Sequence, residues 1–142
     1  MMKKMYLTLT FVLLCTVITA QAEMRFHLAQ EKNIMTVNVK NADDLGAFDI
    51  TLTYDPEKFT YKNLNPGTFL KQSQRQYTML GPIKSPGKLN FSFFSTGHSS
   101  DKGSTGSGTV AEIVYEGNAS SLKIKAVKVS DSFGNRKAAR YE

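Results

Sequence analysis

Apolar and polar residues alternate along most of the chain beyond residue 23. The alternation is strictest in FDITLTYDP, residues 48–56, where Phe48, Ile50, Leu52 and Tyr54 occupy one parity. Successive side chains of a β-strand point to opposite faces of the sheet, so this pattern predicts a strand with one buried face. The other parity carries three polar side chains: Asp49, Thr51 and Thr53.

The same period of two predicts seven further strands, at residues 24–28, 35–39, 59–64, 75–80, 88–95, 109–116 and 121–130. No segment beyond residue 22 has the apolar spacing of an amphipathic helix. Short strands that each show one apolar face are typical of two antiparallel sheets packed together. We therefore predict an all-β fold, an antiparallel β-sandwich.

Three features modify this picture. In residues 121–130 the apolar parity switches between Ile124 and Val127, which indicates either a bulge near Ala126 or a strand that passes between the sheets. Residues 41–46 have the composition of a loop. Residues 95–108 are rich in glycine and serine, and we expect a mobile surface loop there.

The N-terminus has the pattern of a secretory signal peptide. Lys3 and Lys4 precede an apolar stretch over residues 5–18, and Ala20 and Ala22 form a small-residue cleavage site. We predict a signal peptide at 1–22, one domain at 23–142, and a location that is secreted, periplasmic or at the cell surface. No later segment approaches the roughly 18 apolar residues of a spanning helix, so no membrane span is expected after cleavage.

Charge and cysteine content narrow the function classes. The formal net charge is +6, and the basic residues are scattered apart from small groups at 123–128 and 136–140. In an exported protein such groups favour an acidic surface or polymer over nucleic acid as the partner. The one cysteine, Cys15, falls inside the predicted signal peptide. The domain is therefore expected to lack disulfides, a thiol nucleophile and cysteine metal ligands.

The sequence offers little for catalysis, and we predict that the protein is not an enzyme. His27 and His98 are the only histidines, and neither has a partner at metal-ligand spacing. Three aspartates near the Phe48 strand could offer oxygens to calcium, but turn and strand-end roles explain them as well: Asp43, Asp44 and Asp55. No cofactor is expected.

Five segments in order resemble the cohesin domain of bacterial cellulosome scaffolds: residues 35–41 (MTVNVKN), 45–56 (LGAFDITLTYDP), 65–67 (NPG), 108–115 (GTVAEIVY) and 127–135 (VKVSDSFGN). The resemblance implies a nine-stranded jelly-roll sandwich that docks a calcium-loaded dockerin, or another exported protein, through a flat sheet face. It also implies a place in polysaccharide degradation. Asp49 is similar to an aspartate that takes part in that contact in the family.

Parity adds outward-facing residues on two other strands, and these would complete a polar patch if both strands flank the Phe48 strand. The predicted partner-binding residues are Asp49, Thr51, Thr53, Asn90, Ser92 and Glu112.

Polysaccharide binding is the alternative function. Sugar-binding platforms use exposed aromatic rings, and this chain has no tryptophan. Three rings remain as candidates: Tyr77, Phe94 and Tyr141. The C-terminal segment leaves a second choice open, because residues 137–141 either supply the last strand of the jelly roll or leave an open sheet edge.

Overall fold

The computed structural model describes residues 21–142, so the predicted signal peptide lies outside the described residues except for Gln21 and Ala22. The described part is built almost entirely from strands. They are β1 Met24–Glu31, β2 Ile34–Leu45, β3 Ala47–Thr53, β4 Phe59–Pro66, β5 Gln76–Ser85, β6 Lys88–Thr96, β7 Ser104–Gly117, β8 Lys123–Ser130, β9 Arg136–Lys137 and β10 Ala139–Tyr141, with one short 3-10 helix, η1 Thr68–Gln72. Within residues 21–142 no helix is long and apolar enough to cross a membrane.

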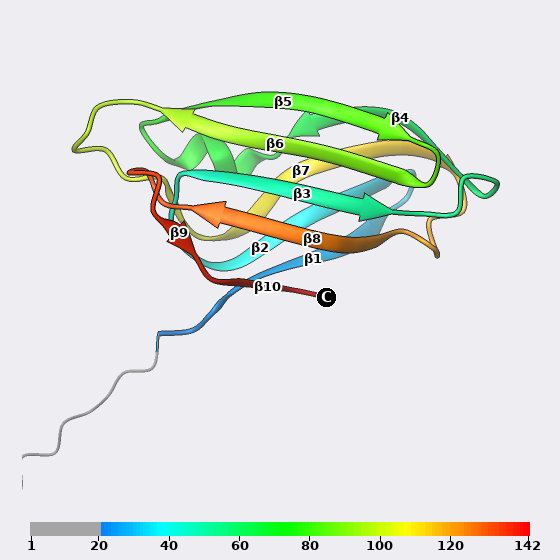
Figure 1. The fold of residues 1–142 in the computed structure, drawn as a ribbon, viewed down its shortest axis with the longest axis horizontal. Coiled ribbons are helices and arrows are strands. Elements are labelled where there is room, and N and C mark those ends of the chain that lie inside the picture. The colour runs from blue at the N-terminus through cyan, green and yellow to red at the C-terminus, as the bar shows by residue number, and fades with distance from the viewer. Residues whose placement is uncertain (1–20) are drawn as a thin grey trace, which may run out of the picture.

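The strands form two five-stranded sheets packed face to face, which confirms the predicted sandwich. One sheet has the order β10-β1-β2-β7-β4 and the other β5-β6-β3-β8-β9. In Figure 1 the second sheet faces the viewer, with β5 at the top and β8 below β3. All pairs are antiparallel except β1 with β10.

The core lies between the sheets and is made by the apolar parity of their strands. Phe48 on β3 packs between Phe26 of the opposite sheet and Phe93 of β6, with ring centroids 6.1 and 5.2 Å apart. Phe59 and Tyr115 stack at 5.0 Å near the other end. Phe69 of η1 is fully buried and adds to the same core.

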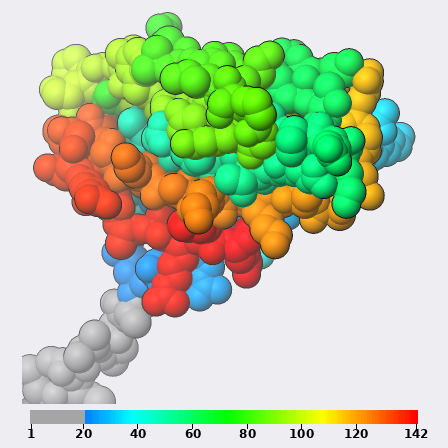
Figure 2. Space-filling model, turned by 45° about the vertical axis from the view of Figure 1, so that its right-hand side comes forward, coloured from blue at the N-terminus to red at the C-terminus, as the bar shows by residue number. Residues whose placement is uncertain are grey.

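The C-terminal segment closes the side of the sandwich. It changes sheets at Ala138, because β9 pairs with β8 whereas β10 pairs with β1. The Tyr141 hydroxyl donates to the Lys125 carbonyl across the gap at 2.8 Å. Figure 2 shows these residues in red between the orange β8 and the blue N-terminal strand. The last strand predicted for residues 137–141 is therefore present, and its split raises the strand count of the described part to ten.

Two local predictions needed correction and one was resolved. Residues 41–46 are mostly strand, because β2 continues to Leu45 through irregular positions at Asn41 and Asp44, both with positive φ. Residues 104–108 also belong to a strand, since β7 begins at Ser104 and pairs with β2. The parity switch in β8 is a bulge: Ala126 pairs with Thr51 and Ile124 with Leu52, which leaves Lys125 unpaired.

Candidate functional site

The outward surface of β5, β6, β3 and β8 carries the best candidate site, and we call it the Asp49 face. On β3 the buried residues Phe48, Ile50 and Leu52 alternate with half-buried polar ones. Asp49 and Thr51 therefore point away from the core because their neighbours point into it. This is the arrangement that the alternating pattern predicts.

Hydrogen bonds from β6 hold the Asp49 carboxylate in place. The Ser92 hydroxyl donates to Oδ2 at 2.5 Å, and the Asn90 amide lies 3.1 Å from Oδ1 and 3.3 Å from Oδ2. The same amide lies 3.0 Å from the Thr51 hydroxyl. An ionised carboxylate can accept about four hydrogen bonds, so Asp49 keeps acceptor capacity for a partner while its orientation is set.

The sheet register shows which predicted residues come together. Asp49 lies opposite Ser92, Thr51 opposite Asn90, and Thr53 opposite Lys88. Five of the six predicted binding residues therefore share one surface: Asp49, Thr51, Thr53, Asn90 and Ser92.

Glu112 does not belong to this surface, and its expected place beside Asp49 is wrong. It lies on β7 in the other sheet, opposite Thr36 of β2 and Asn65 of β4. The second neighbour of β3 is β8, which places Lys128 opposite Asp49. Parity indicates which way Glu112 points but not which sheet contains its strand.

Exposed apolar side chains lie on the same face, and only Phe94 among them had been singled out from the sequence. Leu80 and Ile83 of β5 are 56% and 71% exposed, and they lie opposite Ser92 and Asn90. Phe94 of β6 is also exposed. A sequence signal existed for Leu80 and Phe94, which occupy the outward parity of strands whose inward parity is already apolar. Ile83 shares the parity of Tyr77 and Met79, and it faces outward because the register shifts between Leu80 and Ile83. Clustered exposed apolar residues are typical of interaction sites.

A depression of about 410 Å³ opens on the face beside Asp49. Its floor and rim come from β3, β6, β8, β9 and the loop that joins β8 to β9: Ala47, Phe48, Asp49, Ser92, Phe93, Phe94, Lys128, Val129, Ser130, Gly134 and Arg136. It combines an acceptor, two cations and an aromatic ring. Such a site can recognise a side chain of a partner.

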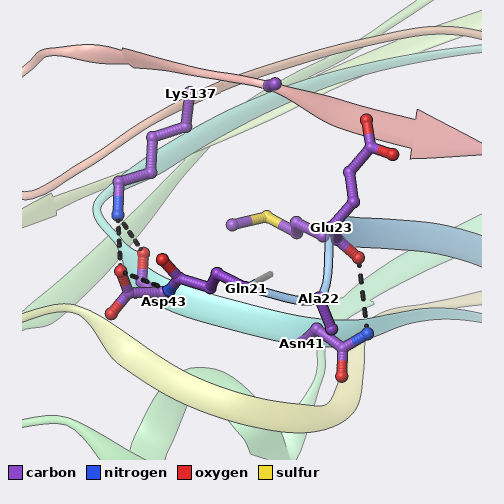
Figure 3. A pocket seen from close by; sticks show the side chains of 8 residues that line it. Gln21, Ala22, Glu23, Asn41, Asp43 and Lys137 are labelled. Atoms are coloured by element: carbon purple, nitrogen blue, oxygen red, sulfur yellow. Dashed lines mark hydrogen bonds and ion pairs between the residues drawn. The ribbon is translucent and has the colours of Figure 1, made fainter. Parts of the chain in front are cut away.

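A second cavity of about 320 Å³ lies where the N-terminal segment meets the C-terminal one (Figure 3). The Lys137 ammonium donates to the Asp43 backbone carbonyl at 2.6 Å and to its carboxylate at 3.1 Å. Gln21 donates to the same carboxylate at 3.3 Å, and Asn41 donates to the Glu23 carbonyl. These hydrogen bonds hold the N-terminal segment and Lys137 of β9 against β2, which indicates a structural role.

The Asp43–Lys137 pair makes stability depend on pH. The hydrogen bond and the charge of Lys137 lower the pKa of Asp43 below its ordinary value of 3.8. A lowered folded-state pKa adds stability above the unfolded-state value, and this stability is lost as the pH falls through the folded-state pKa. We expect Lys137→Met to lower the free energy of unfolding by less than about 1 kcal/mol near neutral pH, because both side chains of the pair are partly exposed to solvent. Denaturant unfolding should show this deficit shrinking below pH 3.8; a constant deficit would contradict the assignment.

The three candidate calcium aspartates each have protein partners. Asp43 contacts Lys137, and Asp55 accepts from the Glu57 amide at 3.0 Å. The buried Asp44 carboxylate accepts from the Gly103 amide at 2.6 Å and from the Ser132 hydroxyl at 2.9 Å. Within residues 21–142 no three His, Cys, Asp or Glu side chains are grouped so that they could hold a metal ion.

The three candidate aromatic rings do not form one platform. Phe94 lies on the Asp49 face, whereas Tyr141 belongs to β10 of the other sheet. Tyr77 is half-buried, and its hydroxyl contacts the Leu45 carbonyl and accepts from the Ser104 amide. A flat sugar-stacking surface made of these three rings is therefore excluded.

Comparisons with known proteins agree on one family. Residues 31–140 match the family model described as the Cohesin domain. No curated protein matches the chain. Solved structures do: a type II cohesin, A11, from Bacteroides cellulosolvens has a TM-score of 0.67 at 14% identity, covering 83% of this chain and 95% of that one.

Two further similar structures differ in setting. A non-cellulosomal cohesin from the hyperthermophilic archaeon Archaeoglobus fulgidus has a TM-score of 0.62 at 15% identity, covering 84% of this chain and 86% of that one. A type I cohesin–dockerin complex from Clostridium thermocellum, Coh-OlpC-Doc435, has a TM-score of 0.66 at 12% identity, covering 87% of this chain and 92% of that one. At these identities the likeness shows the fold alone.

Proposed function

The chain belongs to the cohesin domain family, and from this membership we propose that it is a non-catalytic module that docks another protein through the Asp49 face. The observation that carries the proposal is the fixed Asp49 carboxylate, the one acidic side chain in the paired rows of a partly apolar sheet surface. A preorganised acceptor loses little conformational entropy when a partner binds.

The size of the face suits this role. A stable, specific interface covers about 800 Å² on each partner. Four neighbouring strands, spaced about 4.8 Å apart, and the loops at their ends offer a surface of that order. Leu80, Ile83 and Phe94 add exposed apolar area to this face, and clustered exposed apolar side chains are typical of interaction sites.

We further propose that the partner is an exported protein of dockerin type. The C. thermocellum structure is a cohesin in complex with a dockerin, and the pattern at residues 1–22 supports export of this chain. A function in polysaccharide degradation belongs to the same proposal, and capture of a polysaccharide-degrading protein would support it.

The test is capture of partners by residues 23–142 from the secreted fraction of the source organism. We expect Asp49→Lys to reduce capture at least about tenfold, because it removes the acceptor that Asn90 and Ser92 hold in place at the centre of the face. Glu112→Lys is the matched control, since it changes charge equally on the opposite sheet. Thermal melting of each variant shows that it is folded.

Equal capture by wild type and Asp49→Lys would remove Asp49 from the interface. Loss of capture by Glu112→Lys alone would indicate that the interface lies on the other sheet. Retardation on a panel of polysaccharides, with no protein captured, would favour the carbohydrate-binding alternative.

A further inference from the structure

A single aromatic side chain projects from the loop at the end of the Asp49 face. Phe133 lies between β8 and β9 and is 69% exposed. The next residue, Gly134, lines the depression beside Asp49, as do Phe94 and Arg136. The loop that carries the ring therefore borders the proposed docking site.

The Phe133 loop is held by its own hydrogen bonds. The Asp131 carboxylate accepts from the amides of Phe133 and Asn135 at 2.9 and 2.8 Å, and from the Asn135 side chain at 3.1 Å. Two backbone bonds join Asp131 to Gly134 and Asn135. An exposed aromatic ring on a rigid loop has little freedom to lose on binding, which is the property of an interface anchor.

The charge of the face is almost all of one sign. Four exposed cations lie on it or at its edge: Lys88, Lys123, Lys128 and Arg136. Asp49 is the one acidic residue in the paired rows of β5, β6, β3 and β8, and its partners there are neutral side chains. The ion pairs found within residues 21–142 involve none of the four cations.

We infer that the partner presents an acidic surface with an apolar cleft, in which Phe133 inserts while carboxylates face Lys128, Lys123 and Arg136. This inference rests on the proposed docking function and specifies its chemistry. Phe133 is the apolar anchor of the contact. The cations select an acidic partner and speed its approach, because complementary charge steers association.

The probe is a synthetic amphipathic peptide of about 20 residues, long enough to form a helix, with leucine on one face and glutamate on the other. Three comparison ligands separate the contributions: the same peptide with lysine in place of glutamate, polyglutamate without leucine, and heparin as a polyanionic glycan. Binding to residues 23–142 is measured by calorimetry at low and high salt.

We expect the glutamate–leucine peptide to bind at least about tenfold more tightly than each comparison ligand, and more weakly at high salt. Phe133→Ala and Lys128→Glu should each lower the affinity for the glutamate–leucine peptide about tenfold. Lys40→Glu is the matched control, because Lys40 is exposed on β2 of the opposite sheet and the charge change is the same. It should leave the affinity unchanged.

Equal binding of the acidic and basic peptides would overturn the acidic partner. Equal binding of polyglutamate or heparin would overturn the apolar cleft, as would full affinity in Phe133→Ala. The capture experiment with Asp49→Lys tests the docking function separately from this inference. If capture of a protein depends on Asp49 but is unchanged in Phe133→Ala and Lys128→Glu, the docking function stands and this inference is wrong.

Discussion

Phe48→Ala is expected to lower the free energy of unfolding by about 3–5 kcal/mol. The side chain is 2% exposed and packs between Phe26 and Phe93, one from each sheet. Its removal leaves a cavity at the centre of the sandwich, where strands on both sides limit collapse. Because a domain of this size is stable by about 5–15 kcal/mol, the loss would be a large fraction of the total. Denaturant unfolding monitored by circular dichroism measures it.

Phe133→Ala is the matched control, since it deletes the same atoms from a side chain that is 69% exposed. We expect a change of less than about 0.5 kcal/mol. Similar losses in the two variants would show that Phe48 does not hold the sheets together. A normal stability of Phe133→Ala also ensures that any loss of binding by this variant reflects the contact itself.

Gly46→Ala is expected to destabilise the domain by about 3 kcal/mol. Gly46 joins β2 to β3, its amide donates to the Ser130 carbonyl, and its carbonyl accepts from the Ser95 amide, both at 2.9 Å. A Cβ at this position would lie 2.1 Å from the Asp131 carbonyl oxygen and 2.4 Å from the Ser132 amide nitrogen. Both obstacles are backbone atoms, so the start of β3 must move away from the chain that follows β8. This movement also changes the shape of the depression beside Asp49, which Ala47 and Ser130 help to line.

The control for Gly46→Ala is Gly97→Ala. There the nearest atom to a new Cβ would be the Arg75 Cγ at 3.1 Å, a side-chain atom, and the nearest backbone atom would be the Arg75 Cα at 3.5 Å. We expect a change within about 1 kcal/mol. Thermal and denaturant unfolding of the two variants test the comparison; equal stabilities would mean that the β2–β3 junction can rearrange without cost.

Most strands could be predicted because their signal is local. Residues 48–56 alternate so regularly that the burial of Phe48, Ile50 and Leu52 follows from the sequence pattern. The switch of parity near Ala126 was also visible, although the choice of a bulge needed the register with β3. The family followed from the order of five short segments and is confirmed by the match over residues 31–140.

Predictions for polar, glycine-rich segments were less successful. Residues 104–108 have the composition of a loop, yet Ser104 is 1% exposed. Its hydroxyl donates to the Phe69 carbonyl at 3.0 Å, and the preceding Gly103 amide donates to the buried Asp44 carboxylate. These partners lie 35 and 59 residues away in the chain. Composition reports what a segment prefers in isolation, whereas such distant hydrogen bonds can turn it into a strand.

By itself, the sequence determined the fold class and, for regularly alternating strands such as β3, which side chains face the core, since both follow from a repeat of two residues along one segment. Only the tertiary structure decided which strands are neighbours. It brought Asn90 and Ser92 to Asp49, across 41 and 43 residues of chain, and placed Glu112 on the opposite sheet. It also placed Lys128 and the Phe133 loop beside the same carboxylate. Parity specifies a direction for each side chain, but a binding surface is made by strands that meet across the sheet, and their pairing depends on the packing of the whole domain.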